Sequence, residues 1–96
     1  MTRRVTFKFR LYTAADTQNS VQALANLTSL CHEHLEGRFE IEVVDVFREP
    51  KRALADGIRM TPTLVKLSPA PIQKIVGTLC QTQRVLQMLG LDIIAA

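Results

Sequence analysis

The fold is decided by the stretch Val5-Thr6-Phe7-Lys8-Phe9-Arg10-Leu11-Tyr12, in which apolar and polar side chains alternate. A period of two residues places the apolar side chains on one face and the polar side chains on the other. The pattern therefore predicts a β-strand over residues 5–12 with one face buried in a core. Small and polar residues follow at 13–20, where Asp16 or Thr17 can cap a helix.

A helical pattern follows this strand, and a second strand follows the helix. The helix is predicted over residues 18–35 and ends before Gly37, because glycine is favoured just past a helix C-terminus. Its apolar stripe contains Val21, Leu24, Leu27, Cys31 and Leu35. Residues 39–46 are rich in β-branched side chains and predict the second strand. A strand, a helix and a strand in this order predict a βαβ unit with parallel strands and a right-handed crossover.

The second half of the chain predicts shorter elements. Pro50 can open a short helix over residues 51–56. The turn at residues 60–63 contains Thr61-Pro62, whose peptide bond is a candidate for cis geometry. Two strands are then expected, at residues 64–67 and 72–76, with a turn at residues 68–71 between them.

A third helix is expected near the end of the chain. Thr78 and Gln81 match a capping box, so the helix should begin there and end at Gly90, before an apolar tail at residues 91–96. The complete order is βαβ, then a short helix, then ββα. This order predicts an α/β fold of the thioredoxin-like class, with one domain spanning residues 1–96.

Composition and charge favour a protein partner. The formal net charge is +3, with basic residues gathered at the start of the chain and acidic residues in its middle. Such a distribution suits a partner of complementary charge. Nucleic-acid binding is not expected, because the chain has no Trp and a single tyrosine for stacking on bases. A membrane segment or signal peptide is not expected either, which predicts a cytoplasmic protein.

The chemistry of a redox enzyme is missing from the expected site. A thioredoxin-type enzyme places its reactive thiols at the start of the first long helix, where the helix dipole lowers the thiol pKa. The loop at residues 13–20 contains no cysteine, and Cys31 lies toward the other end of that helix. The segment Cys31-His32-Glu33-His34 spreads its side chains around a helix and predicts no metal site. We therefore expect no enzymatic activity and no cofactor, with a redox protein that uses Cys80 as the alternative.

A set of segments, in order along nearly the whole chain, carries a resemblance to a known family. They are Phe9-Arg10-Leu11-Tyr12, Asp16-Thr17-Gln18-Asn19-Ser20, Val43-Val44-Asp45-Val46-Phe47-Arg48-Glu49-Pro50, Ile58-Arg59-Met60-Thr61-Pro62-Thr63-Leu64-Val65-Lys66, Ser68-Pro69-Ala70-Pro71-Ile72-Gln73-Lys74-Ile75-Val76-Gly77 and Gly90-Leu91-Asp92-Ile93-Ile94. Together they resemble the KaiB family. The stretch at residues 84–90 is longer than in the family, and Ala70 interrupts a run that is often all proline, which indicates a homologue outside the core clock.

The resemblance implies a regulatory protein that binds a KaiC-type ATPase of the RecA class. It also implies a metamorphic protein, which keeps its βαβ half and can rebuild the second half as helix-helix-strand, the form that self-associates into dimers or tetramers. Slow isomerisation at Pro62, Pro69 and Pro71 fits such behaviour. One fixed thioredoxin-like fold remains the alternative, as does a stress-response adaptor with another protein client.

The resemblance also points to individual residues. The surface that faces the ATPase in the family corresponds here to Lys66, Lys74 and Arg84, near Gly90 and Asp92. A second contact region corresponds to Arg48 and Lys51, where the second strand ends. The backbone positions implied in the switch are Pro62, Pro69, Pro71, Gly90 and Asp92.

Overall fold

The computed structural model describes residues 5–90 of the chain. Its elements are β1 (Phe7–Thr13), α1 (Gln18–His34), β2 (Phe39–Asp45), α2 (Pro50–Ala55), β3 (Thr63–Ser68), β4 (Gln73–Val76) and α3 (Thr82–Met88). The βαβ-α-ββα order predicted from the sequence is confirmed. The predicted roles of Asp92 and of the tail at residues 91–96 lie outside the described residues.

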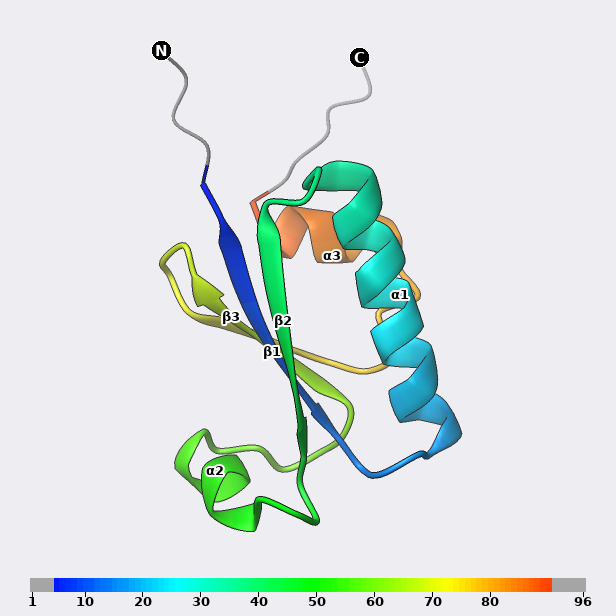
Figure 1. Cartoon of the computed structure of the whole chain (residues 1–96), viewed down its shortest axis with the longest axis vertical. Helices are drawn as coiled ribbons and strands as arrows, with labels where there is room; N and C mark the ends of the chain where they lie inside the picture. Colours follow the sequence, from blue (N-terminus) through cyan, green and yellow to red (C-terminus); the bar gives the residue numbers. More distant parts are fainter. Residues whose placement is uncertain (1–4, 91–96) are drawn as a thin grey trace.

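The strands form one sheet in the order β2-β1-β3-β4. β1 pairs in parallel with β2, as the βαβ prediction requires, while β3 runs antiparallel to both β1 and β4. Figure 1 shows α1 and α3 together on one side of this sheet and the short α2 near the end of β2. No helix within residues 5–90 is long and apolar enough to cross a membrane.

Two apolar clusters lie on the two faces of the sheet. The larger cluster packs α1 and α3 against the odd-numbered residues of β1, and the residues fully buried in it include Leu11, Leu27 and Leu64. The smaller cluster lies on the α2 side and contains Tyr12, Val44, Ala53 and Val65. Successive side chains of β1 point to opposite faces of the sheet, so this strand contributes to both clusters. The face that the sequence marks as polar carries Tyr12, which is fully buried in the smaller cluster.

Local predictions failed at two places. Val21, expected on the buried stripe of α1, is 56% exposed, because it lies beside the outer strand β2 and lines an open depression together with Val43. The capping box is wrong as well, since α3 begins at Thr82 and no side chain caps it. The Thr61–Pro62 bond is cis, as predicted, and the Ser68–Pro69 and Ala70–Pro71 bonds are also cis.

The segment before α3 is extended for a tertiary reason. Asn26 Nδ2, from α1, donates a hydrogen bond to the main-chain oxygen of Thr78 at 2.7 Å. The next residue, Leu79, enters the larger core with 6% exposure and a φ of 64°. Because these two contacts hold Thr78 and Leu79 outside a helix, the first helical turn can form only after them.

Candidate functional site

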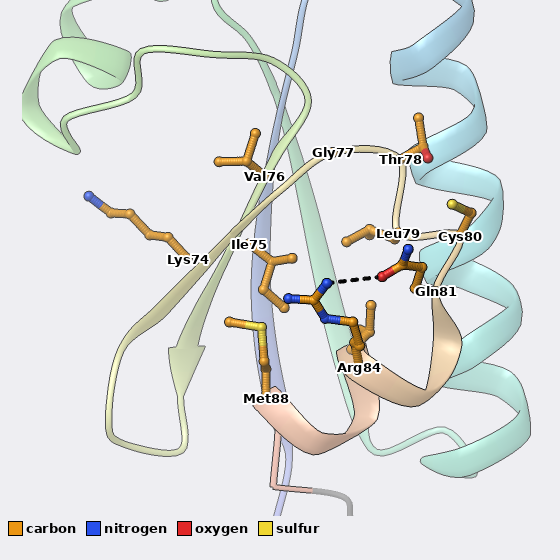
Figure 2. A pocket seen from close by; sticks show the side chains of 11 residues that line it. Lys74, Ile75, Val76, Gly77, Thr78, Leu79, Cys80, Gln81, Arg84 and Met88 are labelled. Carbon is orange, nitrogen blue, oxygen red and sulfur yellow. Dashed lines mark hydrogen bonds between the residues drawn. The ribbon is translucent and has the colours of Figure 1, made fainter.

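A groove between β4 and α3 brings together residues that the sequence singled out. It has a volume of about 450 Å³ and is lined by Lys74, Ile75, Val76, Gly77, Thr78, Leu79, Cys80, Gln81, Arg84, Val85 and Met88. We call it the β4–α3 groove (Figure 2). β4 is the outer strand of the sheet on this side. The groove therefore combines an open strand edge with one side of a short helix.

Arg84 supplies the charge of this groove. In Figure 2 its guanidinium reaches back over the groove toward Ile75. Arg84 Nη1 donates to Gln81 Oε1 at 3.3 Å, which leaves further guanidinium N–H groups for an incoming acceptor. The lining contains apolar side chains and no carboxylate. Such a groove suits an apolar segment of a partner that carries an acidic side chain.

Lys74 belongs to the lining but points away from the centre of the groove (Figure 2). It pairs across the sheet with Val65, so its side chain lies on the α2 side. Its Nζ donates a hydrogen bond to the main-chain oxygen of Asp56. Lys74 is thus exposed but already engaged at the end of α2.

Lys66 is not an exposed neighbour of Lys74 and Arg84. It is only 4% exposed, whereas its predicted role needs an accessible charge. β3 lies between β1 and β4, and Lys66 shares a face with Leu64, which belongs to the larger core. The long aliphatic stem of a lysine can be buried in this way.

Lys51 lies in α2 and Arg48 two residues before that helix, and Figure 1 shows α2 at the opposite end of the fold from α3. Arg48 lines a second depression, of about 370 Å³, together with Asp16, Asp45 and Val43. Lys51 is exposed in α2. The structure therefore separates these two residues from the β4–α3 groove, and the predicted contact residues do not form one patch.

The predicted backbone positions that the structure describes lie within the second half of the fold or at its end. Pro62 is buried, and its main-chain oxygen accepts from Gly77 N at 2.9 Å, which ties the start of β3 to the end of β4. Pro69 and Pro71 lie in the turn between these strands. Gly90 follows α3 with a φ of 76°, a conformation that favours glycine.

A polar network on the α2 side was missed by the sequence predictions. Arg10 Nε donates to Glu42 Oε1 at 2.9 Å, and Arg10 Nη1 donates to Asp56 Oδ2 at 3.0 Å. Arg52 Nη2 donates to Glu42 Oε2 at 2.9 Å. Tyr12 donates its hydroxyl proton to Asp56. No local pattern reveals this network, because Arg10 and Tyr12 come from β1 while Arg52 and Asp56 come from α2 and its end.

The network also shifts the acidity of its members. The hydrogen bond from Tyr12, and then that from Arg10, lower the pKa of Asp56. The hydrogen bonds from Arg10 and Arg52 lower the pKa of Glu42. Burial, followed by the bond to Asp56, raises the pKa of Tyr12. Both carboxyl groups are therefore held in their charged forms.

The two cysteines are both free and lie in different surroundings. Cys31 is fully buried in α1, and this burial raises its thiol pKa to about 12. Cys80 is exposed in the β4–α3 groove, before the first residue of α3. Within residues 5–90 no group of three or more His, Cys, Asp or Glu side chains is placed to hold a metal ion.

Comparisons with known proteins agree with this architecture. The family model of the KaiB domain matches residues 10–91. The chain is 42% identical over 85 residues to the circadian clock protein KaiB3 of Synechocystis sp., covering 88% of this chain and 81% of the relative. It is also 42% identical over 89 residues to the circadian clock oscillator protein KaiB of Nostoc punctiforme, covering 93% of this chain and 84% of the relative.

Solved structures support the thioredoxin-like fold. Chloroplastic thioredoxin z matches with a TM-score of 0.73 at 21% identity, over 91% of this chain and 78% of that chain. The N-terminal domain of Synechococcus elongatus SasA matches with a TM-score of 0.66 at 19% identity, over 95% and 87%. The family that the sequence comparison identifies consists of clock regulators and not of enzymes. On the match over residues 10–91 and the identity to its relatives, the chain belongs to the KaiB family.

Proposed function

We propose that this chain is a non-enzymatic regulator that binds a ring-shaped KaiC-type ATPase of the RecA class. It would act in a circadian clock or in a stress-signalling system derived from one. The observation that carries the proposal is the KaiB match over residues 10–91, together with relatives named as circadian clock proteins. Thioredoxin-type enzymes carry their reactive thiols at the start of the first long helix. In this chain the loop before α1 has no cysteine.

The β4–α3 groove is the proposed main contact with the ATPase. Arg84 offers guanidinium N–H groups between apolar walls, which suits an acidic side chain on an apolar segment of the ATPase. Lys74 borders the same groove, with its ammonium group bound to the main-chain oxygen of Asp56. Arg48 and Lys51, at the other end of the fold, are proposed as a second contact region. The burial of Lys66 argues for a structural role in the described fold.

Three further properties belong to the same proposal. The second half, from α2 to α3, would exchange with a helix-helix-strand arrangement that self-associates into dimers or tetramers, with the three prolines inside it and Gly90 at its end. One domain would span residues 1–96. The protein would work in the cytoplasm, without nucleic acid, membrane or cofactor.

The test is the affinity of the purified protein for the KaiC-type ATPase of its own organism. We expect Arg84→Glu to weaken binding by about tenfold or more, because a repelled charge replaces the cation of the groove. Arg59→Glu is the matched control, since Arg59 is also exposed but does not line the groove. Equal binding by both variants and the original chain would reject the groove as the interface.

The adaptor function would be favoured by the absence of any complex with the folded ring. Cys80 provides a separate test, because its exposure in the groove is the one observation that favours the redox alternative. Full activity of a Cys80→Ser variant in cells would remove that alternative.

A further inference from the structure

The short helix α2 has almost no apolar attachment to the rest of the fold. Of its six residues, only Ala53 is buried, and Leu54 is 78% exposed. By contrast, α1 buries Ala23, Leu27, Leu30 and other residues against the sheet. An alanine side chain buries little surface, so apolar packing alone holds α2 weakly.

Polar contacts replace this missing attachment. The carboxylate of Asp56, the residue that caps the C-terminus of α2, accepts from Arg10 Nη1 at 3.0 Å and from the hydroxyl of Tyr12. The Tyr12 hydroxyl also lies 3.3 Å from the main-chain oxygen of Arg52. Glu42 of β2 binds Arg52 at 2.9 Å and Arg10 at 2.9 Å. The last turn of α2 and its C-cap are thus joined to β1 and β2 through polar and charged groups.

Partial burial strengthens these contacts at their centre. The side chains of Arg10 and Asp56 are 23% and 30% exposed, and Tyr12 is fully buried. Hydrogen bonds to charged groups are worth more than neutral ones, and more again where water is partly excluded. The lowered pKa of Asp56 fits a carboxylate that its neighbours keep charged.

The same residue also holds β4. Lys74 Nζ donates a hydrogen bond to the main-chain oxygen of Asp56. It also lies next to Gly57, 3.5 Å from the position that a Cβ atom would take on that residue. Asp56 therefore binds β1 through its side chain and β4 through its backbone. Loss of the Asp56 contacts would release both α2 and the ammonium group of Lys74.

We propose that Asp56, with Arg10, Tyr12 and Glu42, forms a polar latch that fixes α2 to the sheet and keeps Lys74 occupied until α2 opens. The latch makes the opening of α2 a local event, sensitive to charge and salt, which does not require the larger core to unfold. Its regulatory consequence rests on the proposed function. A partner can bind the ammonium group of Lys74 only after the latch opens, or by displacing the main-chain oxygen of Asp56 from that group.

Amide hydrogen exchange measured by NMR tests the latch without any partner. The reporters are the amides of Ala53, Asp56, Gly57 and Ile58, whose acceptors lie in or beside α2, compared with Leu35 in the large core. We expect Asp56→Asn to accelerate exchange at α2 by about tenfold or more, since it removes the negative charge that strengthens the hydrogen bonds from Arg10 and Tyr12. Exchange at Leu35 should stay within about a factor of two.

Two controls keep the result decisive. Asp16→Asn is the matched variant, because Asp16 is an exposed aspartate in the loop before α1, and it should leave α2 exchange unchanged. If Asp56→Asn fails to fold, the original chain serves: raising salt from about 0.05 M to 1 M should accelerate exchange at α2 more than at Leu35. Unchanged α2 exchange, or equal acceleration at α2 and Leu35, would overturn the latch.

A binding arm separates the latch from the proposed function. If the KaiC-type ATPase binds, Asp56→Asn should form the complex faster than the original chain, because α2 opens more often and each opening separates the main-chain oxygen of Asp56 from Lys74. A selective rise in α2 exchange with no binding by either chain would support the latch and reject the partner. Binding at the same rate, with unchanged α2 exchange, would support the partner and reject the latch.

Discussion

Leu79→Ala tests how the β4–α3 groove is held in place. Leu79 is 6% exposed and is the buried residue of the segment that crosses from β4 to α3. The next two residues, Cys80 and Gln81, are exposed, and Figure 2 shows the Gln81 side chain reaching toward Arg84. The segment owes its course to this side chain and to the bond between Asn26 and Thr78. Removal of the leucine side chain should therefore loosen the groove wall as well as the core.

The magnitude follows from the burial. Replacement of a buried leucine by alanine costs about 2–5 kcal/mol, and the lower part of this range applies where neighbours can relax into the space. Leu79 is followed by exposed residues that can relax, so we expect about 2–3 kcal/mol of lost unfolding free energy. This is a large share of the roughly 5–15 kcal/mol that stabilises a small domain.

Urea unfolding followed by circular dichroism measures this loss directly. The dependence of the free energy on urea should stay the same, because the variant exposes the same surface on unfolding. Leu54→Ala is the matched control, since Leu54 is 78% exposed and should change stability by less than about 0.5 kcal/mol. A loss below about 1 kcal/mol for Leu79→Ala, or equal losses in the two variants, would refute the role given to Leu79.

Two further predictions concern titration and thiol chemistry. The pKa values of Asp56 and Glu42 are lowered in the fold, so their stabilisation is complete above the unfolded pKa values and is lost as pH falls from about 5 to below 3. Urea midpoints measured across this range should fall less steeply in the double variant Glu42→Gln, Asp56→Asn, and an unchanged slope would contradict the assignment. Because burial raises the pKa of Cys31 to about 12 whereas Cys80 is exposed, iodoacetamide at pH about 8 should label Cys80 in the folded protein and Cys31 only after unfolding. Mass spectrometry of the labelled peptides gives the answer, and rapid labelling of Cys31 in the folded chain would be inconsistent with its buried position in α1.

The elements of the fold could be predicted because their signals are local. Alternation in β1 and the repeat of apolar residues in α1 each arise within one segment, and Gly37 marks the end of α1 in the sequence itself. The parallel pairing of β1 and β2 then follows from the helix that connects them, because such a crossover joins parallel strands.

The failed predictions share a tertiary cause. The capping residues at Thr78 and Gln81 were overruled by the burial of Leu79 and by the bond from Asn26, neither of which the local sequence reveals. Lys66 was named as a partner contact by the family resemblance, whereas its place on the inner strand β3 turns its side chain toward the larger core. Sequence position alone does not say which strand of a sheet becomes the outer one.

The candidate site could be predicted only in part, for the same reason. Arg84 and Lys74 were named by the family resemblance, and the structure places both on the border of one groove. The network of Arg10, Glu42 and Asp56 joins residues 32 and 46 positions apart. Individually these are ordinary surface charges, and only the packing of α2 beside β1 and β2 gives them a common role.

The time course of complex formation with the KaiC-type ATPase from the same organism tests the central claim most directly. Purified protein and folded ATPase ring are mixed, and samples taken at intervals are separated by size-exclusion chromatography. A regulator limited by a conformational change should form the complex slowly, at a rate nearly independent of protein concentration. The absence of a complex at every time, with the ATPase shown to be a folded ring, would contradict the proposed function.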